Sequence, residues 1–104
     1  MQIVAFVGAL PRSEAGTVIA RQLVRSGTSI GANYREANRA ESPVDFAHKV
    51  AIAVKEAAET EYWLLLCKRT NLGNEVTLAT LPGEADELLA ILSTILRRAR
   101  GTRR

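Results

Sequence analysis

The chain has 104 residues, enough for one hydrophobic core and too few for two, which predicts a single domain. Hydrophobic residues make up 47% of the chain and charged residues 24%, a balance that excludes an intrinsically disordered protein. The few aromatic residues and the abundance of Ala and Leu favour packed helices over a β-sandwich.

The net charge of +3 is unevenly distributed, because the last nine residues contain five arginines and no acid. These arginines are Arg97, Arg98, Arg100, Arg103 and Arg104. Bases at the end of a helix suit the helix dipole, but two of the five lie beyond Gly101. Residues 101–104 are therefore interpreted as a basic tail, either for an anionic partner or for solubility.

The first ten residues are apolar, and no positively charged start precedes them as in a signal peptide. They predict a short core helix that ends before Pro11. No stretch reaches the about 20 apolar residues that span a bilayer, so no membrane association is expected. The single cysteine, Cys67, lies among leucines and predicts a buried thiol in a reducing compartment. We expect a cytoplasmic protein.

Residues 13–40 contain no proline and follow a helical period. The predicted core stripe is Ile19, Leu23, Ser26, Ile30, Asn33 and Ala37. Arginines follow the same rhythm about 200° around the helix, at Arg21, Arg25, Arg35 and Arg39. Gly27 and Gly31 each cost a helix about 1 kcal/mol, which indicates that another backbone comes close there. Asn33 is interpreted as a polar core residue that sets the helix register.

A third helix is predicted from Ser42, a capping residue followed by proline, to about Asn71, with Gly73 as the stop signal. Its core stripe is Phe46, Val50, Ala53, Ala57, Thr60, Leu64 and Cys67. A second apolar set, Ile52, Trp63 and Leu66, falls on a different face. A monomeric bundle does not need both faces, so the second set predicts an oligomer interface.

Residues 73–81 have turn-forming character and predict a connector, after which Pro82 and Gly83 open the last helix. The apolar stripe of that helix is Leu88, Leu92, Ile95 and Ala99, flanked by Leu89, Ile91 and Leu96. Short links make neighbouring helices antiparallel. The predicted fold is all-α, an antiparallel up-and-down four-helix bundle over residues 1–100 with a short first helix.

Residues 26–37 resemble the central motif of bacterial four-helix-bundle proteins first noted as reading frames within intervening sequences of 23S ribosomal RNA. The likeness depends on Ser29, Ile30, Asn33 and Glu36, and residues 45–46 and 54–64 resemble the third helix of one branch. It covers residues 12–97. The resemblance implies a left-handed bundle that assembles into a homopentamer, without an established activity.

The same fold is similar to that of an accessory protein of diversity-generating retroelements, a basic pentameric barrel that binds nucleic acid and a reverse transcriptase. That likeness implies RNA or DNA, and a partner protein such as a reverse transcriptase, as partners. Two features depart from the family pattern. Residues 34–37 read YREA in place of IAEG, and the first helix is shorter. Either this helix is shortened here, or the true start lies upstream.

No catalytic machinery, cofactor site or metal site is expected. The chain has no nucleophile–base arrangement, no glycine-rich phosphate loop and no metal-ligand spacing, and His48 is its only histidine. Glu56 and Glu59 lie three residues apart, but Lys49 and Lys55 nearby indicate a salt-bridged helix face.

The leading hypothesis is a non-enzymatic homo-oligomer that binds nucleic acid through repeated arginine-rich surfaces on the second helix and at the C-terminus. Alternatively, the arginines of the second helix pair with Glu56, Glu59 and Glu61 across a subunit interface. A protein-interaction scaffold that binds no nucleic acid is the second hypothesis, supported by the extra apolar face of the third helix.

Overall fold

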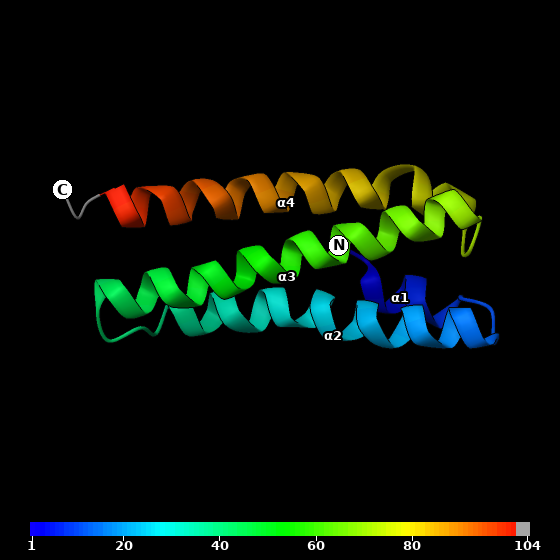
Figure 1. The fold of residues 1–104 in the computed structure, drawn as a ribbon, viewed down its shortest axis with the longest axis horizontal. Coiled ribbons are helices and arrows are strands. Elements are labelled where there is room, and N and C mark those ends of the chain that lie inside the picture. Colours follow the sequence, from blue (N-terminus) through cyan, green and yellow to red (C-terminus); the bar gives the residue numbers. More distant parts are fainter. Residues whose placement is uncertain (102–104) are drawn as a thin grey trace.

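The computed structural model describes residues 1–101, which form four α-helices: α1 (Ile3–Gly8), α2 (Glu14–Ala37), α3 (Pro43–Thr70) and α4 (Glu75–Gly101). α3 lies between α2 and α4, packs against both, and runs antiparallel to them (Figure 1). The short α1 packs on α2 near the end of the bundle that carries the α3–α4 turn (Figure 1). The all-α four-helix bundle with a short first helix is therefore confirmed.

α2 and α3 begin at serine caps, as the sequence predicts for α3. The Ser13 hydroxyl accepts the backbone N–H of Gly16, and the Ser42 hydroxyl accepts that of Asp45, each at 3.0 Å. Both bonds satisfy an N–H that has no partner within the helix. Pro43 occupies the first helical turn of α3, where its missing N–H costs nothing.

The start of α4 differs from the sequence prediction, because residues 75–81 are helical and Pro82 lies inside the helix. Asn74 initiates the helix by accepting the N–H of Thr77 through its side chain at 3.1 Å. An internal proline costs about 3 kcal/mol. Leu78 and Leu81 are nearly fully buried, and at about 1.5–3 kcal/mol each they offset that cost. Packing thus overrides the local proline signal.

The core divides into two parts along the bundle. In the first, Ile3 and Phe6 of α1 and Leu10, two residues beyond its end, pack with buried residues of the other three helices. In the second, only α2, α3 and α4 contribute, through Ile30, Ala53, Ala57 and Leu92. The first part is a four-helix core, whereas the second is a three-helix core built around two alanines.

The α2–α3 contact contains a buried polar pair, Ser26 and Thr60, whose hydroxyl oxygens are 2.9 Å apart. The hydroxyl of Thr60 also lies 2.8 Å from the carbonyl oxygen of Glu56. Both side chains are fully buried, and an unpaired buried hydroxyl costs about 1–3 kcal/mol. This pair fixes the register of α2 against α3.

α3 ends one residue earlier than predicted, at Thr70, because Asn71 adopts a left-handed conformation with φ 55°. Gly73 follows with φ 104°. A methyl group on Gly73 would lie 2.6 Å from Cζ of Phe6, so the residue is required both by its backbone conformation and by the packing of α1.

We expect Gly73→Ala to destabilise the protein by about 1–3 kcal/mol, because it adds backbone strain and displaces the Phe6 ring. Thermal and urea unfolding measure the change. The matched control is Gly83→Ala on α4, where an added methyl group meets nothing within 4 Å. The control is expected to be neutral or stabilising by up to about 1 kcal/mol. Equal effects of the two substitutions would contradict this account of Gly73.

Candidate functional site

The arginines of α2 are not equivalent. The guanidinium of Arg25 donates to Glu56 of α3 at 3.1 and 3.3 Å, and it also pairs with Glu59. Its Nε donates to Gln22 at 3.2 Å. Glu59 in turn accepts the indole N–H of Trp63 at 3.3 Å. Arg25 is thus held within its own chain and its charge is balanced there, and these contacts lie between α2 and α3.

This network shifts the ionisation of its members. The indole N–H of Trp63 and the guanidinium of Arg25 lower the pKa of Glu59, while desolvation opposes them. The hydrogen bond to Glu59 raises the pKa of Arg25. Each group is therefore charged at neutral pH, and Arg25 is a structural cation.

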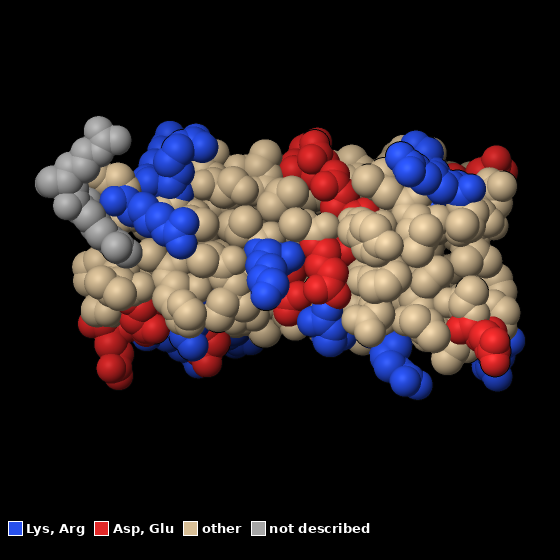
Figure 2. All heavy atoms as spheres, in the orientation of Figure 1, with Lys and Arg blue, Asp and Glu red and all other residues tan. Residues whose placement is uncertain are grey.

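The other arginines of α2 and α4 are exposed. Arg35 lies in the last turn of α2, and Arg39 lies two residues beyond the end of that helix. Arg97, Arg98 and Arg100 lie at the C-terminal end of α4. Because α2 and α4 run in the same direction, all five arginines lie at one end of the bundle (Figure 1). Figure 2 shows basic side chains gathered over this end of α4. Within residues 1–101, every salt bridge is made by Arg25.

We call these five residues the arginine end: Arg35, Arg39, Arg97, Arg98 and Arg100. Arg21 lies nearer the opposite end of α2 and is separated from them. Arg103 and Arg104 lie outside the described residues. Acidic residues near the α2–α3 turn, Glu36, Glu41 and Asp45, partly offset the α2 arginines. The α4 arginines have no acid within the last fourteen described residues, 88–101.

The four residues of the family motif, Ser29, Ile30, Asn33 and Glu36, differ in burial and in contacts. The amide of Asn33 donates to the carbonyl of Ser29 at 2.9 Å, within the same helix. Asn33 is half-buried, whereas Ser26 makes the polar contact between helices inside the core. Ile30 is buried and Glu36 is exposed.

Ile52, Trp63 and Leu66 of α3 are half-buried, and Trp63 and Leu66 pack partly against the four-helix core. The more exposed neighbours are Tyr62, at 57%, and Leu65, at 41%. Tyr62 packs edge-on against Trp63, with 5.0 Å between the ring centroids. The exposed apolar surface of α3 is therefore centred on Tyr62 and Leu65, two residues that the stripe pattern did not single out.

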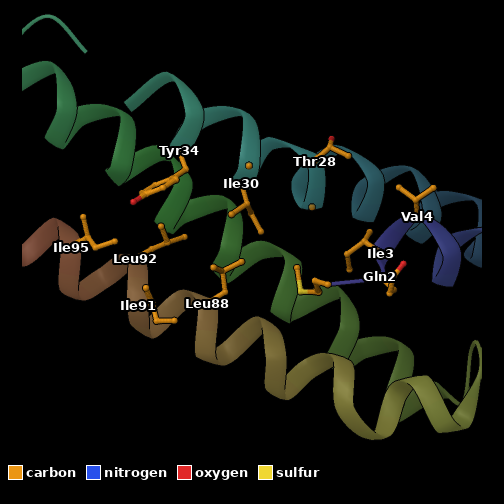
Figure 3. Close-up of a pocket in the computed structure, with 13 residues that line it drawn as sticks. Gln2, Ile3, Val4, Thr28, Ile30, Tyr34, Leu88, Ile91, Leu92 and Ile95 are labelled. Atoms are coloured by element: carbon orange, nitrogen blue, oxygen red, sulfur yellow. The ribbon is translucent and has the colours of Figure 1, made fainter. Parts of the chain in front are cut away.

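An apolar groove lies between α2 and α4, beside the first residues of the chain (Figure 3). Its volume is about 510 Å³. It is lined by Met1, Gln2, Ile3, Val4, Gly27, Thr28, Ile30, Gly31, Tyr34, Leu88, Ile91, Leu92 and Ile95, none of which carries a charged side chain. Ile91 is 56% exposed at its edge. Periodicity identifies the apolar stripe of α4 but not the groove, which depends on where α1 lies.

Glu61 of α3 was predicted as a partner for the α2 arginines, but its carboxyl faces Asp86 of α4 instead. Burial and, after it, the neighbouring carboxylate of Asp86 raise the pKa of Glu61 above its ordinary value of 4.5. Two acidic side chains thus meet at the α3–α4 contact.

Within the described part of the chain, no cluster of three or more His, Cys, Asp and Glu side chains could hold a metal ion. Cys67 is fully buried, and desolvation raises the pKa of its thiol. His48 is exposed on α3. None of the described helices is long and apolar enough to cross a membrane.

We expect Glu61→Gln to stabilise the protein at pH 7 by about 0.5 kcal/mol, the size of a like-charge contact between helix surface residues. The raised pKa means that the folded state binds this proton more tightly than the unfolded state. The stabilisation that the proton gives is present below pH 4.5 and is lost as the pH rises through the folded-state pKa. The advantage of the variant should therefore disappear at pH 4.

Thermal unfolding at the two pH values measures this difference, and Glu84→Gln, an exposed residue of α4, is the control. A Glu61→Gln variant that is less stable than the wild type at pH 7 would show that the carboxylate makes a favourable contact.

Comparison with known proteins places this geometry in a family. The model of the 23S rRNA-intervening sequence protein family matches residues 1–94. A crystal structure of a protein of unknown function from Bacteroides thetaiotaomicron VPI-5482, of the S23 ribosomal protein family, has a TM-score of 0.83 and 41% sequence identity. The match covers 92% of this chain and 89% of the other. No curated protein matches the chain. Neither the family nor the solved relative is described as an enzyme.

Proposed function

The chain belongs to the 23S rRNA-intervening sequence protein family, and from this premise we propose that it is a non-enzymatic, self-associating bundle that binds nucleic acid phosphates. The observation that carries the proposal is the arginine end. Five exposed guanidinium groups gather there, whereas Arg25 is neutralised within the chain.

The chemistry of this end suits phosphate. A guanidinium presents its N–H groups in a planar fork that matches two phosphate oxygens and stays charged at every physiological pH. Arg98 and Arg100 lie in the last turn of α4, and no acid lies nearby on that helix. Their charge is therefore available to an anionic partner.

The proposed contact is with the phosphate backbone of the nucleic acid and not with its bases. Sequence readout needs side chains that reach base edges in a groove, and binding of single strands uses aromatic rings on which bases stack. The aromatic pair Tyr62–Trp63 lies on α3, toward the opposite end of that helix from the arginine end (Figure 1). Binding to structured RNA, such as ribosomal RNA, or to duplex DNA would then depend on charge and repetition, and self-association multiplies the contacts.

A second candidate function, a protein-interaction scaffold, is favoured by the exposed apolar residues Tyr62 and Leu65 of α3. An exposed apolar patch of this kind fits a partner protein. That this partner is a reverse transcriptase stays a prediction from the resemblance. Binding to nucleic acid separates the two functions.

We expect the protein to bind ribosomal RNA or duplex DNA with an affinity that falls steeply with salt. Three phosphate contacts per chain predict a loss of roughly 40-fold between about 50 and 200 mM salt, measured by fluorescence anisotropy. The triple variant R97E/R98E/R100E should abolish binding at the lower salt concentration.

The matched control reverses three charges at the opposite end of the bundle, R12E/K68E/R69E, and should retain at least part of the affinity (Figure 1). If the wild type binds neither nucleic acid at the lower salt, the scaffold function is the correct one. If both triple variants lose affinity equally, the contact is not located at the arginine end.

A further inference from the structure

The arginines of α4 lie on two different faces of that helix. One face carries a shallow surface depression, which we call the α4 hollow. It has a volume of about 460 Å³ and is lined by Ser93, Leu96, Arg97, Arg100 and Gly101. Positions 93, 97 and 100 follow the helical spacing of four and three residues, which places their side chains in one row. Arg98 lies on another face, in a row with Thr94.

The two arginines of the hollow are directed away from the carbonyl end of the helix. Side chains of an α-helix tilt toward its N-terminus, so Arg97 and Arg100 extend over the preceding turn, where Ser93 and Leu96 lie. The last carbonyl groups of a helix carry partial negative charge and oppose an anion. A phosphate bound in the hollow therefore lies beside Ser93 and Leu96 and not at these carbonyl groups.

Ser93 offers a hydroxyl group that the helix does not use. The hydroxyl of Thr94 donates to the carbonyl of Ala90 at 3.0 Å, and the hydroxyls of Thr28 and Thr70 donate in the same way one turn back in their helices. The hydroxyl of Ser93 makes no hydrogen bond within residues 1–101. It can therefore donate to a ligand in the hollow.

The segments of the described chain that border the hollow contain no acid. The N-terminal half of α3 runs antiparallel beside the C-terminal half of α4 (Figure 1), and residues 46–55 of α3 include neither Asp nor Glu. Ala53 and Val54 of this segment pack in one core with Leu92 of α4. Residues 88–101 of α4 also lack an acid. The positive charge of the hollow is thus less compensated than that of the α2 arginines.

We propose that the α4 hollow holds two successive phosphates of one nucleic-acid strand, an inference that rests on the proposed function. Arg97 binds one phosphate and Arg100 the next, because Cβ atoms three residues apart on a helix are separated by about 5–6 Å, close to the spacing of neighbouring phosphates along a strand. Ser93 donates to the phosphate at Arg97, and Leu96 contacts the sugar between the two phosphates. Arg98, on the other face, contributes through its charge.

Exchange of arginine for lysine separates this site from a surface that is merely basic. R97K/R100K keeps both charges and removes the planar forks that bind two phosphate oxygens each. Its affinity for ribosomal RNA should fall about tenfold, with the slope of log affinity against log salt unchanged because the charge is unchanged. The matched control, R35K/R98K, makes the same exchange at the arginine end outside the hollow and should lower affinity by less than about twofold.

The hydroxyl group gives a second test on the same RNA. Ser93→Ala removes a hydrogen bond to a charged phosphate and should lower affinity about three- to tenfold. The matched control is Thr94→Ala, whose hydroxyl is already bound within the helix, and it should bind as the wild type does. Alanine is a better helix former than serine or threonine, so a lower affinity is not caused by unfolding, which circular dichroism checks.

A small probe examines the hollow directly. A uridine dinucleotide that carries an additional phosphate on its first nucleotide has two successive phosphates. In heteronuclear NMR, the Nε–H signals of Arg97 and Arg100 should shift together along one saturating curve, while those of Arg35 and Arg98 shift less. The dinucleotide without the additional phosphate should cause smaller shifts at the same concentration.

These measurements separate the hollow from the proposed function. Nucleic-acid binding by the wild type, with equal losses in R97K/R100K and R35K/R98K and wild-type affinity of Ser93→Ala, would overturn the hollow and uphold the proposed function. A wild type that binds neither ribosomal RNA nor duplex DNA, but whose Arg97 and Arg100 respond to the dinucleotide along a saturating curve, would overturn the proposed function and leave the hollow as a phosphate site.

Discussion

The contact between α2 and α3 is the constraint on which the rest of the structure depends. α3 lies between α2 and α4, and its buried residues belong to both parts of the core (Figure 1). Around Leu92, the small residues Ala53 and Ala57 of α3 let α2, α3 and α4 approach closely. Burial of apolar surface there contributes about 25 cal/mol for each Å² removed from water.

Two contacts hold α2 and α3 in a fixed position relative to each other. The hydroxyl contact between Ser26 and Thr60 is fully buried. Arg25 directly precedes Ser26, and its ion pairs with Glu56 and Glu59 lie beside this contact at the surface. Both contacts join the same two helices and hold them in a single register. The arginines at the end of the bundle are thereby held on rigid helices, with their charges free for an anion.

Local signals in the sequence predict much of this fold. The Ser42–Pro43 start of α3 and the core stripes of α2 and α3 follow from capping and from a 3.6-residue period. The start of α4 was predicted wrongly, because Pro82 is a stronger local signal than the burial of Leu78 and Leu81, which depends on tertiary packing. The same limit applies to the site. Composition indicates the arginines, but only the fold shows that Arg25 reaches a carboxylate 31 residues away and that the arginines of α2 and α4 share one end.

The central claim is that exposed guanidinium groups at the arginine end bind nucleic acid phosphates, and the slope of log affinity against log salt concentration tests it most directly. Each phosphate contact that is lost should reduce this slope by about 1. We therefore expect a shallower slope for each single substitution of Arg97, Arg98 or Arg100 by Ala than for the wild type. A slope that is unchanged in all three variants would contradict the account.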